Sequence, residues 1–343
     1  MKKLISVIVL CLFASLVFAQ DSNEKPYMVK KFNANQIKNI GVQTSGGGIT
    51  IEGGSENEAI VEVYIRASNW NGKVDREEIE DRLKNYILTV SQSGSNLECI
   101  AKNKSQNMNW KRGLSITFKV FSPKNVNTDL NTSGGGISMK NLKGNLRFHT
   151  SGGGLSLAGL SGDVMGKTSG GGISLTNCHD LVDLVTSGGG ISAKNSTGTI
   201  KLRTSGGGLD LENLKGKINA TTSGGGIDAD HISGELITST SGGSIDLNDV
   251  GGNIKASTSG GGIHANISTI DSYLNLSASS GNIKVDMPMS KGMDMDIEAQ
   301  RVSYASLKNF DGEIEKDRIY GKLNGGGAKV RIHAGSGNVS INR

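Results

Sequence analysis

The sequence predicts an all-β protein whose main body is a single-stranded β-helix (a β-solenoid) with 18-residue coils and a small inserted α+β capping element near the N-terminus. A Thr-Ser-Gly start recurs eight times at intervals of 18 residues without slippage. Within each repeat the apolar residues alternate with period two, and no helical period is present. A strict repeat of this kind is typical of a solenoid, in which each unit stacks on the one before it.

The N-terminus has the features of an export signal. Two lysines precede an apolar run from Leu4 to Phe18, and small residues occupy the positions that signal peptidase reads, the last being Ala19. We therefore expect residues 1–19 to be a signal peptide and the mature chain to begin at Gln20. No second apolar run of about 18 residues follows, so we expect no transmembrane helix.

Charge and cysteine content narrow the classes of partner. The chain has 37 Lys and Arg against 32 Asp and Glu, and removal of the two lysines of the leader leaves a net charge of +3. This charge is too small to indicate a nucleic-acid partner. The mature chain keeps Cys99 and Cys178, which permit an oxidising compartment but imply no disulfide framework.

Residues 20–51 are expected to form the first strands and the first coil, because the half-repeat around Thr44 matches the positions of the later array. The interval from Thr44 to Thr132 is 88 residues, which is not a multiple of 18, so another segment interrupts the solenoid. We assign residues 52–125 to this inserted element.

The inserted element is predicted to contain both a helix and strands. Asp75 and Glu78 form a capping-box pattern ahead of Ile79, which predicts a short helix, and the alternation from Leu114 to Val120 predicts a strand. We expect this element to cover the exposed edge of the first coil, which would otherwise invite strand addition by another chain.

Residues 126–275 contain the eight regular repeats. The sixth position of every repeat is aliphatic and is expected to face inward: Ile137, Leu155, Ile173, Ile191, Leu209, Ile227, Ile245 and Ile263. We expect the glycines of each start to form a corner of the coil, either because Cβ atoms would collide between coils or because the backbone needs φ > 0. Residues 276–343 depart from the 18-residue interval and are expected to form irregular C-terminal coils and a cap.

Four features resemble the bacterial “putative adhesin” family of exported β-strand-repeat proteins of unknown function. They are the TSGGGI-type coil, the interruption near the N-terminus, the Ser-Pro-Lys stretch at Ser122–Lys124 and the closing GSGNVSI at Gly335–Ile341. The resemblance covers roughly residues 30–343 of the chain. It implies a right-handed β-helix and a cell-envelope or extracellular location, and it supplies no catalytic residues.

One acidic patch is the strongest candidate site. The seventh and ninth positions alternate with inward positions, and in three consecutive coils they carry Asp210, Glu212, Asp228, Asp230 and Asp246. Stacked coils would place these carboxylates on rungs about 4.8 Å apart. Like charges near 4 Å repel by about 1 kcal/mol in water, and a hard cation such as Ca²⁺ would relieve this repulsion. The patch is therefore read as a solvated face, with a weak Ca²⁺ site as the alternative and no other cofactor.

The same carboxylates raise the alternative of a carbohydrate-active β-helix enzyme, since paired carboxylates can hydrolyse glycosides. A regular ladder, however, forms no cleft, and no insertion loop lies over it. Aromatic residues, at 4% of the chain, supply no platform for a sugar. We therefore expect no enzyme.

Three further features receive structural interpretations. A sparse basic stripe at the sixteenth and eighteenth positions is read as a solubilising surface: Arg147, His149, Lys167, Lys201, Arg203 and Lys255. The methionines from Met287 to Met295 could bind Cu(I), but their period-two alternation favours core packing. Cys178 occupies a position that is aliphatic in five other repeats and is expected to be buried, and the five histidines fall at different positions.

The sequence therefore favours a non-enzymatic, exported protein of the cell envelope or surface that presents ladders of Thr, Ser, Asp and Lys side chains. We expect it in the periplasm, on the outer surface or outside the cell. Its partner is expected to be an envelope or extracellular polymer or protein, and the chain itself is expected to be a monomer.

Overall fold

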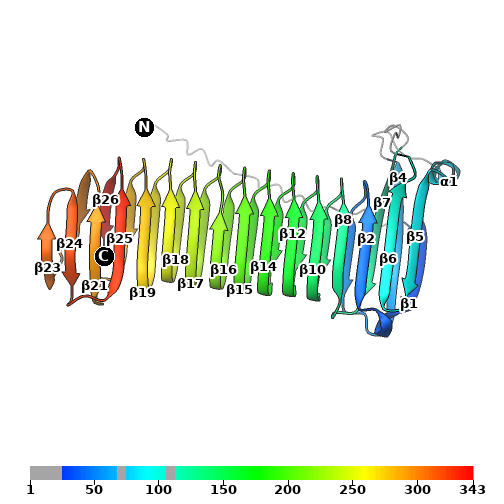
Figure 1. Cartoon of the computed structure of the whole chain (residues 1–343), viewed down its shortest axis with the longest axis horizontal. Helices are drawn as coiled ribbons and strands as arrows, with labels where there is room; N and C mark the ends of the chain where they lie inside the picture. The colour runs from blue at the N-terminus through cyan, green and yellow to red at the C-terminus, as the bar shows by residue number, and fades with distance from the viewer. Residues whose placement is uncertain (1–24, 68–74, 106–112, 343) are drawn as a thin grey trace, which may run out of the picture.

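The computed structural model describes residues 25–67, 75–105 and 113–342, and the predicted signal peptide lies outside these residues. They form one long β-solenoid whose coils follow each other along a single axis (Figure 1). The predicted fold class is confirmed. Among the described residues no helix has the length and apolar character needed to span a bilayer.

Each central coil has two strand segments separated by a bend. In the first coils of the array the segments are separate strands: β8 (Asn127–Thr132), β9 (Ile137–Lys140), β10 (Lys143–Thr150), β11 (Leu155–Ala158), β12 (Ser161–Thr168), β13 (Ile173–Thr176) and β14 (His179–Thr186). In the later coils the segments run together as β15 (Ile191–Thr204), β16 (Leu209–Thr221), β17 (Ile227–Thr240), β18 (Ile245–Thr258) and β19 (Ile263–Ala278).

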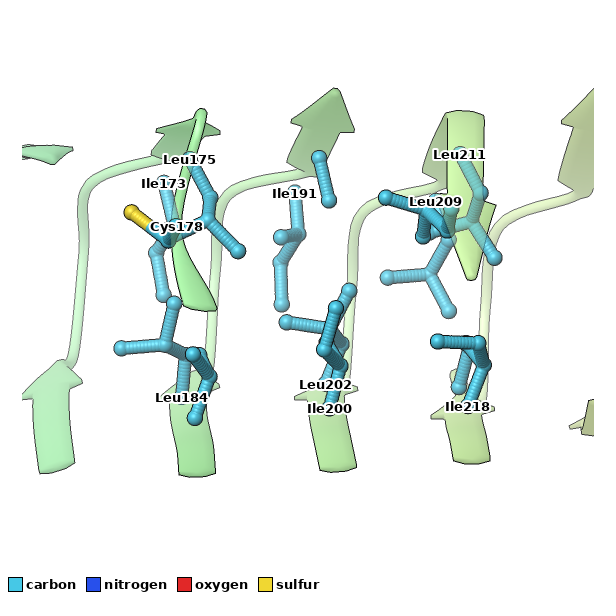
Figure 2. Packing of buried hydrophobic residues seen from close by; sticks show 14 of the residues in the cluster. Ile173, Leu175, Cys178, Leu184, Ile191, Ile200, Leu202, Leu209, Leu211 and Ile218 are labelled. Atoms are coloured by element: carbon cyan, nitrogen blue, oxygen red, sulfur yellow. The ribbon is translucent and has the colours of Figure 1, made fainter. Parts of the chain in front are cut away.

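Successive coils pair in parallel, and equivalent residues of the repeat lie side by side. Leu155, for example, pairs with Ile137 on one side and Ile173 on the other. All eight aliphatic residues of the sixth position are buried, and Figure 2 shows members of these stacks pointing into the interior. Burial of such a side chain contributes about 1.5–3 kcal/mol to the stability of the fold. The aliphatic stacks therefore supply most of the free energy that favours the solenoid.

The Thr-Ser-Gly-Gly-Gly corner is governed by close approach between coils. None of its glycines in the described array has a positive φ, so the expectation that φ > 0 explains them is wrong. A Cβ built on the central glycine Gly171 would lie 2.3 Å from the carbonyl oxygen of Gly153 in the preceding coil. The alternative expectation, collision of Cβ atoms with the neighbouring coil, is the correct one.

The threonine of each start closes this corner with a buried hydrogen bond. Thr168 Oγ1 donates to the carbonyl oxygen of Gly153 at 2.6 Å and accepts from the backbone N–H of Gly171 at 3.3 Å. The same bond to the preceding coil recurs from Thr132 to Thr258. Each hydroxyl therefore links its own coil to the previous one.

The opposite corner of the coil uses left-handed backbone instead. The tenth position has φ between 50° and 55° at six non-glycine residues: Asn141, Asn177, Asn195, Asn213, His231 and Asp249. Glycines three residues later, such as Gly198 and Gly216, also have positive φ. Asn and Asp tolerate this conformation better than other side chains because their short polar groups bond to the local backbone.

At the N-terminal end the chain builds a coil out of sequence order. β2 (Asn39–Thr44) and β3 (Ile49–Gly53) pair with β8 and β9 on one side and with β6 (Asn96–Asn103) and β7 (Leu114–Ser122) on the other. Antiparallel strands then close the end: β5 (Tyr86–Ser93) on β6, β4 (Glu58–Ala67) on β7, and β1 (Met28–Asn33) on β4.

Two short helices accompany these strands in the described residues. The helix predicted from the capping-box pattern is confirmed as α1 (Arg76–Leu83), and Asp75 accepts a hydrogen bond from the backbone N–H of Glu78 at 2.9 Å. A 3-10 helix spans Ala34–Gln36.

The C-terminal end, like the N-terminal end, stacks its coils out of sequence order. The last strands of the sequence are not the last strands along the axis. β20 (Ile283–Asp286) pairs with β19 and β26 (Asn338–Asn342), and β25 (Ala328–Ala334) lies between β19 and β21 (Met293–Glu298) (Figure 1). β22 (Arg301–Tyr304) pairs with β26, while β24 (Arg318–Leu323) and β23 (Phe310–Ile314) add antiparallel strands beyond β21.

Candidate functional site

The five predicted acidic residues form two adjacent rows on the outside of the solenoid, which we call the acidic ladder. In one row Asp228 pairs with Asp210 on one side and Asp246 on the other. In the second row Glu212 pairs with Asp230. The inward neighbours Leu211 and Ala229 of the same strands are buried, so strand alternation turns these carboxylates to solvent.

Polar and basic side chains surround the acidic ladder. At one end Lys194 Nζ lies 2.5 Å from Glu212 Oε2 and 3.9 Å from Asp210 Oδ2, and these contacts raise the pKa of Lys194. At the other end His264 Nδ1 lies 3.8 Å from Asp246 Oδ1. In the middle rung His231 Nδ1 lies 2.9 Å from Asp230 Oδ1, whereas Asp228 forms no ion pair among the described residues.

Asp228 occupies that middle rung. Its pKa is raised above the usual range, first by partial burial and then by the like charges of Asp246 and Asp210. A raised carboxyl pKa means that the charged form is disfavoured here. The ladder would therefore gain from a positively charged partner that approaches this rung.

A bound metal ion would need several ligand side chains that converge on one point. Within residues 25–67, 75–105 and 113–342, no group of three or more His, Cys, Asp or Glu side chains is arranged to hold a metal ion. The proposed Ca²⁺ site at the acidic ladder therefore receives no support from this arrangement and stays a prediction.

The basic stripe is partly neutralised by neighbouring carboxylates. Arg147 Nη2 lies 3.3 Å from Asp163 Oδ2, and Arg203 Nη2 lies 2.9 Å from Asp183 Oδ1. Exposed ion pairs of this kind contribute about 0–1 kcal/mol each. These two pairs neutralise part of the stripe, and Lys167, Lys201 and Lys255 form no ion pair among the described residues.

The remaining sulfur and threonine candidates lie inside the protein. Burial raises the pKa of Cys99 to about 12 and also raises the pKa of Cys178, so neither thiol has the character of a nucleophile. Met287, Met293 and Met295 are buried in the core, as their alternation predicts. The threonines that begin the repeats are also buried, so they belong to the interior and not to a surface ladder.

Two surface grooves, each with a volume of about 340 Å³, are present among the described residues. One lies beside Asp286 to Ser290, next to the methionine segment. The other is lined by His231, Asp249, Asp271 and neighbouring small residues, and sequence reasoning missed it. The signal that could have indicated it is the charged pair His231 and Asp249 at a position that elsewhere carries Asn or Gly.

Comparisons with solved structures find three proteins of similar extent. A “putative cell adhesion protein” from Clostridium sporogenes is 14% identical, with 93% of this chain and 99% of that chain covered at a TM-score of 0.20. A “putative adhesin” from Bacteroides fragilis is 13% identical (92% and 96% covered, TM-score 0.30). A “putative lipid binding protein” from Parabacteroides distasonis is 12% identical (93% and 97% covered, TM-score 0.30). Neither the fold nor the function of this chain is inferred from them.

Comparison with protein families gives a more specific result. No curated protein matches the chain significantly. Residues 231–342, which include the groove beside His231 and the out-of-order C-terminal coils, match the family described as “Toastrack DUF4097”. Over these residues, this match confirms the resemblance to a family of unknown function that the repeat motif indicated. Residues 231–342 of this chain are therefore similar to the Toastrack DUF4097 family.

Proposed function

We propose that this protein is an exported, non-catalytic rod that binds an envelope or extracellular polymer through the side-chain ladders of its coils. The observation that carries the proposal is the residue-for-residue register of the coils from β8 to β18. This register repeats each outward side chain at the spacing of neighbouring strands, about 4.8 Å.

A repetitive surface of this kind suits a repetitive ligand. A polymer whose charges recur along its length can contact several rungs at once, and each contact after the first is intramolecular. Weak individual contacts then give useful affinity without an enclosed pocket. The grooves are small, and the ladder is long, which fits binding along the surface better than catalysis in a cleft.

The acidic ladder is the surface that we assign to this contact. Its middle rung carries a carboxylate whose charge is disfavoured by its neighbours Asp210 and Asp246. A cationic polymer would relieve that repulsion. The partner that fits best is therefore an envelope or extracellular polymer with regularly spaced positive groups.

Binding of the mature chain to an isolated envelope fraction tests the proposal. The triple variant D210N/D228N/D246N should lose most of the binding, because it removes one complete row of the ladder. The matched control E98Q/D311N/E313Q removes the same charge from exposed residues of the solenoid ends and should bind normally. Equal binding by the two variants would contradict the assignment of the ladder.

The two alternative functions have direct tests. If the protein is a carbohydrate-active enzyme, the parent chain should cleave envelope polysaccharides and the triple variant should not, whereas we expect no cleavage by either. If the ladder is a divalent-cation site, millimolar Ca²⁺ should raise the melting temperature, because a ligand that binds the native state stabilises it. An unchanged melting temperature would remove the cation hypothesis.

A further inference from the structure

The coil that contains β19 breaks the regular repeat. Thr258 pairs with Ala278, an interval of 20 residues, whereas Thr240 pairs with Thr258 after 18. The pairing of β18 with β19 contains register shifts between Leu247 and Ile254. The excess residues fall next to Asp271, where the surface bulges. Bulges of this kind re-aim side chains and are common beside binding and active sites.

The groove beside His231 lies at this register break. Its walls come from three consecutive coils, with Ser233 in the first, Asp249 in the second, and Thr269 and Asp271 in the third. Gly251 adds no side chain to the lining, and a Cβ there would lie 2.6 Å from Thr269 Oγ1. The lining therefore offers two carboxylates and several hydroxyls around an open floor.

His231 and Asp249 are not required by the backbone. Both residues have left-handed φ, and Asn occupies the same position of the coil at Asn177, Asn195 and Asn213 with the same φ. His231 Nδ1 lies 2.9 Å from Asp230 Oδ1, and its Nε2 lies 3.5 Å from Asp249 Oδ2. An imidazole and a carboxylate thus lie at the groove, although Asn would satisfy the turn.

The chemistry of the lining indicates the ligand class. Carboxylates recognise ammonium groups through charge-assisted hydrogen bonds, and Ser and Thr hydroxyls both donate to and accept from the hydroxyls of a ligand. Ile232 is the one large apolar residue of the lining and is itself buried, so an aromatic or lipid ligand would find no wall to pack against.

We infer that this groove binds an amino-sugar unit, with the ammonium group between Asp249 and Asp271 and the sugar hydroxyls on Ser233 and Thr269. The inference rests on the proposed polymer-binding function and names the chemical class of the polymer. The acidic ladder runs beside the groove on the same coils, so a polymer seated in the groove continues along the ladder.

Calorimetric titration with two matched oligosaccharides tests the inference. Glucosamine oligomers carry free ammonium groups, and N-acetylglucosamine oligomers of equal length do not. The mature chain should bind the glucosamine oligomer at least about tenfold more tightly, since one charge-assisted hydrogen bond contributes that much. Equal binding of the two oligomers, or binding of neither, would overturn the inference.

Three variants locate the site within the chain. D249N/D271N should weaken binding of the glucosamine oligomer about tenfold or more, and D249N places at that turn the residue used at Asn177. S233W fills the groove without changing charge and should abolish binding. The control E98Q/D311N should bind normally, because it removes two carboxylates at the solenoid ends. Unchanged binding by both groove variants would overturn the assignment.

The groove and the ladder fail in distinguishable ways. If D249N/D271N and S233W bind the envelope fraction normally while D210N/D228N/D246N does not, the ladder function stands and the amino-sugar groove is wrong. If the groove variants lose the glucosamine oligomer while the ladder variant keeps the envelope fraction, the groove stands and the ladder assignment is wrong.

Discussion

The two corners of each coil contain glycine for different physical reasons. At the Thr-Ser-Gly-Gly-Gly corner, φ is ordinary and the neighbouring coil leaves no room for a Cβ on central glycines such as Gly171. At the opposite corner, φ is positive and Asn177 or Asp249 replaces glycine without difficulty. The first corner is restricted by contact between coils. At the second corner the tenth position is restricted by the conformation of its own backbone, whereas its glycines three residues later combine positive φ with close contact: a Cβ on Gly198 would lie 2.2 Å from the Asp180 carbonyl oxygen.

The substitutions within the chain itself agree with this distinction. The central glycine of the first corner is kept even in the irregular C-terminal coils, as Gly281 and Gly337, while its neighbours become Ser280 and Asn282. A Cβ on Gly281 would lie 2.1 Å from the carbonyl oxygen of Gly261. The first corner therefore sets how closely coils stack, and the second can vary and carry function.

The largest expected effect is at the central glycine. Gly171→Ala places a Cβ 2.3 Å from the Gly153 carbonyl oxygen and 2.4 Å from the Gly154 nitrogen, so the two coils must separate. We expect a loss of about 3 kcal/mol or more in the free energy of unfolding, measured by urea denaturation. A loss below about 1 kcal/mol would show that the corner is not close-packed.

The threonine of the same corner should have the next largest effect. Thr168→Val keeps the shape of the side chain but leaves the Gly153 carbonyl oxygen and the Gly171 N–H without this buried partner. Loss of such a bond costs about 1–3 kcal/mol. Thr199→Val, on an outward position, serves as the control and should change the urea midpoint little. Similar midpoints for the two variants would contradict the role of the buried hydroxyl.

The opposite corner should be more tolerant. Asn177→Ala places an ordinary side chain at φ 54° and should cost about 1 kcal/mol, whereas Asn177→Gly should be close to neutral. The thermal midpoints of the two variants provide the measurement. If alanine and glycine are equivalent at residue 177, left-handed backbone is not what restricts this corner.

The smallest expected effect concerns the acidic ladder, and it depends on pH. The pKa of Asp228 is raised in the folded protein, so the group favours folding below its unfolded pKa and this contribution is lost as pH rises through the folded pKa. Asp228→Asn should therefore stabilise the protein at pH 7 by less than about 1 kcal/mol and have no such effect near pH 3. A destabilised variant at pH 7 would contradict the like-charge repulsion.

The interior and the acidic ladder could be predicted because both follow from strand alternation. Once Leu155 and Ile173 face inward, the positions between inward residues, such as Asp210 and Asp228, must face solvent. The cause of the first corner could not be read from the sequence, since steric crowding and positive φ both select glycine. The repeated Asn at the tenth position is a signal of left-handed backbone, because Asn tolerates positive φ better than most residues.

The order of the terminal coils and the groove lay beyond sequence reasoning. β25 and β26 carry the same alternation as other coils, and nothing local specifies that β25 pairs between β19 and β21 or that β26 pairs between β20 and β22. The groove depends on where two extra residues near Asp271 are accommodated, which is decided by the packing of Ile270 and Leu274 in the core. Pairing partners and bulges are properties of the whole assembly.

One pair of variants tests the central claim, that contact between coils at the middle glycine fixes the stacking. Gly171→Ala and Gly172→Ser differ by one position, and the chain itself carries Ser244 at the position equivalent to Gly172. A Cβ on Gly172 would lie 3.2 Å from its nearest neighbour, the Gly190 carbonyl oxygen. We predict that the larger serine at residue 172 costs less than about 1 kcal/mol in urea denaturation, while the smaller alanine at residue 171 costs about 3 kcal/mol or more. Equal losses for the two variants would contradict this account.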